Sequence, residues 1–228
     1  MIWKTVLIAS FVVGALAGFE VPEAKREEMK KKLQEVCTKN GAADKISEVE
    51  TSIHTFIDCV KQLFNPETLT DEIEKARPNG ALDEVFQKYC AKAPQLKSCI
   101  HNAMAGITPC ISASYREYIP EANNGTDQLI DFVCHKDGDR IALFIAEGGP
   151  ECFQSKQQEL RQCGTDISNA FGTVENAEKA TLKERCAKYD TFSTCVVKAL
   201  ESCSTPTPGN MAESMLRFVR NGSHCSKA

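Results

Sequence analysis

Apolar residues recur along this chain with the three- to four-residue spacing of amphipathic helices. The clearest stripe predicts one core-facing helix and consists of Ile46, Val49, Ile53, Phe56, Ile57, Val60 and Leu63. Shorter stripes predict further helices around Leu69, Phe86, Ile100, Tyr115, Ile130, Phe144, Leu160, Cys186, Val196 and Leu216. No run alternates apolar and polar residues in the way a hairpin strand does. The pattern therefore predicts an all-α fold.

Proline, glycine and asparagine residues separate these stripes. We expect a polar break at 120–125 between two helices and a turn at 205–209 before the last helix. The stripe around Cys186 and the stripe that follows it to Leu200 predict two separate helices. The segment Asp137-Gly138-Asp139 predicts a turn whose Asp139 caps the next helix.

The N-terminal residues have the composition of an export signal. Lys4 supplies a positive charge, 6–17 is a short uncharged apolar run, and Ala15-Leu16-Ala17 is a small-x-small cleavage site. We expect a signal peptide at 1–17 and a single mature domain at 18–228. No later apolar run has the length of a membrane span, so none is predicted.

Every cysteine lies after the predicted signal, and the number is even. The twelve are Cys37, Cys59, Cys90, Cys99, Cys110, Cys134, Cys152, Cys163, Cys186, Cys195, Cys203 and Cys225. In an exported chain this predicts a disulfide framework that uses all of them. No C-x-x-C pair occurs, so the spacing favours neither a zinc ribbon nor a thioredoxin-type redox site.

The cysteine spacing occurs twice. Cys-Ala-Lys at 90–92 and at 186–188 is followed in both cases by a cysteine after eight residues. The fold class we predict is a disulfide-rich helical bundle built from two related half-repeats of about 95 residues, at 22–133 and 134–228. In this register Cys134 is shared by both halves and Cys163 has no counterpart. We therefore hypothesise that Cys163 forms a bond that joins the halves.

Charge and motifs exclude several classes of function. A net charge of −4 gives no basic surface for nucleic acid or anionic lipid. The four histidines are isolated in sequence, and neither an HExxH nor a G-x-S-x-G motif occurs. We expect no catalytic, cofactor-binding or metal-ligating residue. The sequons Asn124-Gly125-Thr126 and Asn221-Gly222-Ser223 predict N-glycosylation at Asn124 and Asn221.

Three segments carry a resemblance to a known family. They are Val36-Cys37, Tyr89-Cys90-Ala91-Lys92 and Phe132-Val133-Cys134. Together with the signal, the helical pattern and the cysteine series, they resemble the 27 kDa haemolymph glycoprotein family of insects. The resemblance implies a secreted protein of larval blood with no agreed molecular activity and no catalytic residues. It favours a non-enzymatic haemolymph glycoprotein that acts through contacts with extracellular proteins, in immunity or development.

A carrier is the alternative function. In that case a lipid or other small apolar ligand would bind between the two helical halves, in a cavity lined by Met104, Phe153, Met211, Met215 and Phe218. Such stripes are more often ordinary core. The predicted partners are accordingly extracellular proteins or a small apolar ligand, and the sequence leaves the oligomeric state open.

Overall fold

Helices form every regular element in the computed structural model, which describes residues 23–172, 176 and 179–227. The α-helices are α2 (Glu23–Lys39), α3 (Ile46–Leu63), α4 (Pro66–Ala76), α5 (Leu82–Cys90), α6 (Ala93–Ile107), α7 (Ala113–Arg116), α8 (Ile119–Val133), α9 (Asp139–Ala146), α10 (Gly149–Ser155), α11 (Gln157–Phe171), α13 (Leu182–Glu201) and α14 (Thr207–Gly222). The 3₁₀ turns are η1 (Ala43–Lys45), η2 (Arg77–Asn79), η3 (Thr108–Cys110), η4 (His135–Gly138) and η5 (His224–Lys227). The predicted all-α class is confirmed. The predicted signal peptide at 1–17 lies outside the described residues.

Local capping chemistry sets several helix starts. The Asn65 side chain accepts a hydrogen bond from the Thr68 N–H at 2.9 Å, and Pro66 occupies the first helical position of α4. At the start of α13, Thr181 and Glu184 form a capping box in which each side chain accepts from the other residue's backbone N–H. Both signals are short-range and can be found in the sequence.

Four of the predicted boundaries are wrong. The turn expected at 205–209 ends at Pro206, because α14 begins at Thr207 and Pro208 lies in its first turn, where proline is tolerated. The expected break at 120–125 is helical, because Pro120 lies in the first turn of α8, where proline is tolerated. The two helices expected between Leu182 and Leu200 are the single helix α13, since neither glycine nor proline interrupts them. Asp139 does not cap α9 but is its first residue, and Gly138 with a φ of 101° occupies the cap position.

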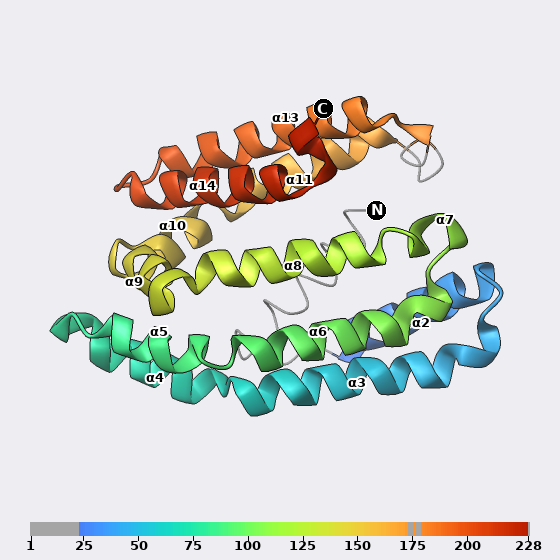
Figure 1. The fold of residues 1–228 in the computed structure, drawn as a ribbon, viewed down its shortest axis with the longest axis horizontal. Coiled ribbons are helices and arrows are strands. Elements are labelled where there is room, and N and C mark those ends of the chain that lie inside the picture. Colours follow the sequence, from blue (N-terminus) through green and yellow to red (C-terminus); the bar gives the residue numbers. More distant parts are fainter. Residues whose placement is uncertain (1–22, 173–175, 177–178, 228) are drawn as a thin grey trace.

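The helices form two groups: α2 to α8 make up the first and α10 to α14 the second, and α8 lies along the contact between them (Figure 1). In one group α3 packs along α6, with α2, α4 and α5 nearby; in the other, α13 packs between α11 and α14. Helix α8 contacts α6 on one side and α14 on the other, and the short helices α9 and α10 connect the groups at one end. We call these the first and second helix groups.

Six disulfides cross-link the helices, three in each group. The pairs are Cys37–Cys110, Cys59–Cys99, Cys90–Cys134, Cys152–Cys203, Cys163–Cys195 and Cys186–Cys225. The hypothesis that Cys163 joins the halves is wrong: α11 lies beside α13, which places the Cα atoms of Cys163 and Cys195 5.8 Å apart. Cys134 pairs with Cys90, so it belongs to the first set alone. No described disulfide connects the two sets.

Among the described residues, the buried apolar side chains form three small clusters. One joins α4, α5 and α9 around Phe86 and Ile145, and a second joins α2, α3 and η3 around the buried Cys37–Cys110 bridge. The third joins α10, α13 and α14 around Leu200, which is fully buried. Because each cluster is small, the bridges supply cross-links that a single large core would make unnecessary.

The lysines of the two Cys-Ala-Lys segments occupy the same kind of site. Lys92 Nζ donates to the carbonyl of Leu63, the last residue of α3, at 2.5 Å, and lies 5.9 Å from the centre of the Phe64 ring. Lys188 Nζ donates to the Ala170 carbonyl near the end of α11 and lies 4.0 Å from the centre of the Phe171 ring. Each lysine thus places a positive charge at the negative end of a helix dipole.

We expect Lys92→Met and Lys188→Met each to lower the free energy of unfolding by about 1 kcal/mol, because each loses a helix-end charge and a cation–π contact. Guanidinium denaturation with the disulfides intact measures this loss. The matched control is Lys31→Met, on the exposed face of α2, which should change stability by less than about 0.5 kcal/mol. Equal stabilities for the three variants would contradict the capping role.

Candidate ligand pocket at the junction of the helix groups

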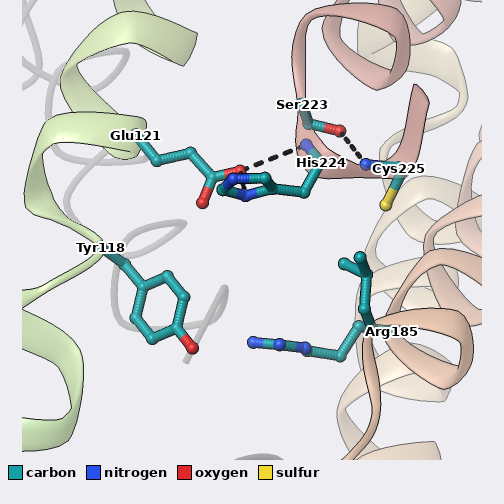
Figure 2. Close-up of a pocket in the computed structure, with 7 residues that line it drawn as sticks. Tyr118, Glu121, Arg185, Ser223, His224 and Cys225 are labelled. Carbon is teal, nitrogen blue, oxygen red and sulfur yellow. Dashed lines mark hydrogen bonds and ion pairs between the residues drawn. The ribbon is translucent and has the colours of Figure 1, made fainter. Parts of the chain in front are cut away.

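A small pocket lies where the start of α8 meets the start of α13 and the C-terminal turn η5. Its cavity volume is about 150 Å³. The lining residues are Tyr118, Glu121, Leu182, Arg185, Ser223, His224 and Cys225 (Figure 2). Its two walls come from different helix groups, so the pocket exists only while the groups are in contact.

The first wall is the beginning of α8. Tyr118 is the cap residue of this helix, and Glu121 lies in its first turn, where the helix dipole favours a carboxylate. Glu121 Oε1 is 2.9 Å from His224 Nδ1 and accepts a longer hydrogen bond of 3.4 Å from the His224 backbone N–H. This pair ties the C-terminal turn to α8 (Figure 2).

The second wall is fixed to α13. The Cys186–Cys225 disulfide anchors η5, and Arg220 donates to the Cys225 carbonyl at 2.9 Å. Arg220 also donates to both carboxylate oxygens of Asp190, at 2.6 and 3.0 Å, and these hydrogen bonds raise the pKa of Arg220. The positions of His224 and Cys225 are therefore set by a covalent bond and a bidentate ion pair.

Among the described residues, Arg185 is the one arginine or lysine that lines the pocket. Its guanidinium carbon lies 5.5 Å from the centre of the Tyr118 ring, and Figure 2 shows the side chain pointing toward that ring. The Nε atom is buried and has no hydrogen-bond partner among the described residues. No described carboxylate forms an ion pair with Arg185, whereas the one carboxylate in the pocket, Glu121, is engaged by His224. The site can accept an anion.

An ion pair joins the two helix groups at the end opposite the pocket. Arg77 in η2 donates to Glu151 Oε1 of α10 at 2.9 Å and to the Ile145 carbonyl of α9 at 2.8 Å. The hydrogen bond from Arg77 is the main cause that lowers the pKa of Glu151 below its ordinary value of 4.5. The first helix group is thus fastened to α9 and α10 by polar contacts as well as by the apolar cluster around Phe86.

The structure separates most of the other candidate residues. His54 is exposed on α3, His101 pairs with Asp127 at 2.9 Å, and His135 lies in η4. Within 23–172, 176 and 179–227, no group of three or more histidine, cysteine or acidic side chains could hold a metal ion.

The apolar residues proposed for a carrier cavity lie on three helices, α6, α10 and α14. None of them lines the junction pocket, and none lines a second pocket of about 300 Å³ beside Phe171 and Lys188. Phe153 and Phe218 are instead exposed to 37% and 39%.

Both sequon asparagines are exposed, as glycosylation requires, but both lie on helices. Asn124 is on α8 rather than in a break, and Asn221 lies in the last turn of α14 rather than after it. Gly222, the middle residue of the second sequon, packs directly on Gln128 of α8: a Cβ added there would lie 1.7 Å from the Gln128 side-chain oxygen. The second sequon therefore borders the contact between the helix groups.

Sequence reasoning identified Cys225 only as a disulfide cysteine and did not predict the pocket. Tyr118, Glu121 and Arg185 belong to no motif, and the segments that carry them are far apart in the chain. The only signal was the position of Arg185 next to Cys186, a cysteine whose partner, Cys225, cannot be read from sequence.

Comparison with known proteins assigns the chain to a family. The family described as "Protein of unknown function (DUF1397)" matches residues 23–225. The chain is 54% identical over 231 residues to the "27 kDa hemolymph protein" of Galleria mellonella, and 52% identical over 228 residues to the "27 kDa glycoprotein" of Bombyx mori. It is 45% identical over 229 residues to the "27 kDa hemolymph glycoprotein" of Manduca sexta. Each alignment covers all of this chain and 98% of the relative.

The chain belongs to the insect 27 kDa haemolymph glycoprotein family. The predicted resemblance is thereby confirmed, and this family member is a secreted, extracellular protein of the haemolymph. None of its described helices has the length and apolar character that crossing a membrane requires. No solved structure matches the haemolymph protein.

Replacing the carboxylate of Glu151, which pairs with Arg77, should make the free energy of unfolding less dependent on pH. Because the pKa of Glu151 is lower in the folded state, its ion pair stabilises the fold at neutral pH, and this contribution is lost as the pH falls through the folded pKa. We expect Glu151→Gln to reduce the free energy of unfolding at pH 7 by less than about 1 kcal/mol, as for other exposed pairs.

The difference from the unaltered protein should shrink as the pH falls below the ordinary glutamate pKa of 4.5 and vanish below the lower folded pKa of Glu151. Thermal unfolding followed from pH 7 to pH 3 measures this change, with Glu74→Gln on the exposed face of α4 as the control. A deficit that stays constant across this pH range would contradict the assignment of the effect to the ion pair.

Proposed function

We propose that this haemolymph protein is a non-enzymatic glycoprotein that acts through contacts with other extracellular proteins, in immunity or development. Its exported form begins after a signal peptide at 1–17 and comprises one domain at 18–228. The relatives carry haemolymph and glycoprotein names, which supports this class of function. The exposed sequon residues Asn124 and Asn221 support N-linked glycans at these two positions.

The observation that carries the proposal is a pair of large exposed apolar residues on the contacting helices α9 and α10. Leu143 on α9 leaves 53% of its surface exposed, and Phe153 on α10 leaves 37%. The two helices contact one another, and the Phe144 ring packs edge-on against Phe153 with centroids 5.5 Å apart. Gly149 permits this packing, because a Cβ there would lie 2.4 Å from the Phe144 ring. Large exposed apolar residues on a rigid support are typical of protein-binding surfaces.

A small-ligand carrier is the second candidate, and the junction pocket supports it in a restricted form. A cavity of about 150 Å³ is smaller than the roughly 300–1,000 Å³ of sites for drug-sized molecules. It therefore favours a compact ligand over a lipid.

We also infer that the chain consists of two related half-repeats, in a register set by the disulfides. Numbered in order within each set of six, the cysteines pair first with fifth, second with fourth and third with sixth in both sets. Lys92 and Lys188 cap helices in the same way in each half. The boundary then lies between Cys134 and Cys152, and α8 and α14, which pack together, are equivalent helices.

The protein-contact proposal predicts that a Leu143→Glu/Phe153→Ser double variant fails to join a complex. Labelled protein added to cell-free insect haemolymph and separated by size-exclusion chromatography should elute in a larger complex when unaltered, and at its free size when doubly substituted. The matched control is Leu182→Glu, which changes a residue that is 39% exposed at the junction pocket and should leave the complex intact. The proposal fails if the unaltered protein elutes at its free size or if all three elute together.

The half-repeat proposal predicts one pairing order in both sets of cysteines. Mass spectrometry of cystine-linked peptides from the unreduced protein reads this order directly. Recovery of the first-to-fifth, second-to-fourth and third-to-sixth bonds in both sets supports the duplication. A different order in either set contradicts it.

A further inference from the structure

We propose that the junction pocket binds a small organic carboxylate, with the carboxylate group held by Arg185 and the apolar body held against Tyr118 and Leu182. This inference is independent of the protein-contact function proposed above, because it concerns a different surface and needs no macromolecular partner. It specifies a ligand class for the restricted carrier function, on which it rests.

Arg185 is the group in the pocket that would bind an anion. Arg185 carries a permanent positive charge, and its buried Nε lacks an acceptor among the described residues. Arg185 lines the pocket and forms no ion pair with a described carboxylate, so an anion bound there would supply its charge partner. The carboxylate of Glu184 on the same turn accepts hydrogen bonds from Thr181 instead, within the capping box.

Glu121 and His224, the other ionisable side chains of the pocket outside Tyr118, contact each other rather than Arg185. Glu121 is the only acidic residue among those lining the pocket, and its Oε1 lies 2.9 Å from His224 Nδ1. The His224 backbone N–H donates to the same oxygen. Because Glu121 already accepts these contacts from His224, its carboxylate is not the partner of Arg185, and the guanidinium is left to a ligand.

The size and walls of the pocket favour an organic ligand over an inorganic ion. A cavity of about 150 Å³ has the volume of one that holds a benzene molecule in another protein. The Tyr118 ring lies opposite the Arg185 guanidinium (Figure 2), and Leu182 is the aliphatic residue that lines the same pocket. A sulfate or phosphate ion would leave these walls without contacts, whereas a long-chain fatty acid would exceed the volume. A monocyclic or short-chain monocarboxylate fits both the charge and the walls.

Isothermal titration of the intact secreted protein with benzoate tests the proposal. We expect a Kd on the order of 1 mM or tighter, as for other ligands with so few atoms. Benzyl alcohol, which keeps the ring and loses the charge, and sulfate, which keeps the charge and loses the ring, should each bind at least about tenfold more weakly.

Variants locate the binding in this pocket. Arg185→Gln should weaken benzoate binding at least about tenfold, whereas Arg217→Gln, which removes an exposed arginine of α14, should leave it unchanged. Leu182→Trp, which fills the pocket and keeps its charge, should also abolish binding and serves if Arg185→Gln folds poorly. No measurable benzoate binding, binding that both pocket variants retain, or equal binding of benzoate and sulfate or of benzoate and benzyl alcohol would overturn the proposal. None of these outcomes bears on the surface at Leu143 and Phe153.

Discussion

Covalent cross-linking within each helix group is the constraint on which the rest of this structure depends. The apolar core is split into three small clusters, and cystines lie inside two of them. A native disulfide contributes about 2–4 kcal/mol, so the three bridges of one group together rival the net stability of an ordinary domain, about 5–15 kcal/mol. The short helices are therefore held in register by sulfur bridges, and reduction should unfold them.

Between the groups no described disulfide is present, so apart from the backbone through α9 and α10 they are held together by noncovalent contacts. Helix α8 packs on α14 through the close approach of Gly222 to Gln128 and the contact of the Phe132 and Phe218 rings, whose centroids lie 5.5 Å apart. The junction pocket draws its walls from both sides of this contact. Each group is cross-linked within itself by three disulfides, whereas the pocket depends on how the two groups meet.

The sequence was sufficient for the parts of the fold that depend on local patterns. The apolar stripe of α3 predicted a helix, and Val49 and Val60 of that stripe are buried in it. Disulfide pairing depends on which helices lie side by side, and spacing alone placed Cys163 wrongly as a bridge between the halves. The junction pocket was not predictable for the same reason: Glu121 and His224 meet only because α8 packs on the second helix group.

The most direct test of this account is a single cut in the backbone. A site-specific protease sequence inserted after Glu147, an exposed residue between Cys134 and Cys152, allows the folded protein to be cleaved once. Electrophoresis under denaturing, non-reducing conditions then shows whether any disulfide spans the cut. The account predicts two separate fragments, each still cross-linked within itself. A single species that falls apart only on reduction would show that a bridge joins the two groups and would contradict it.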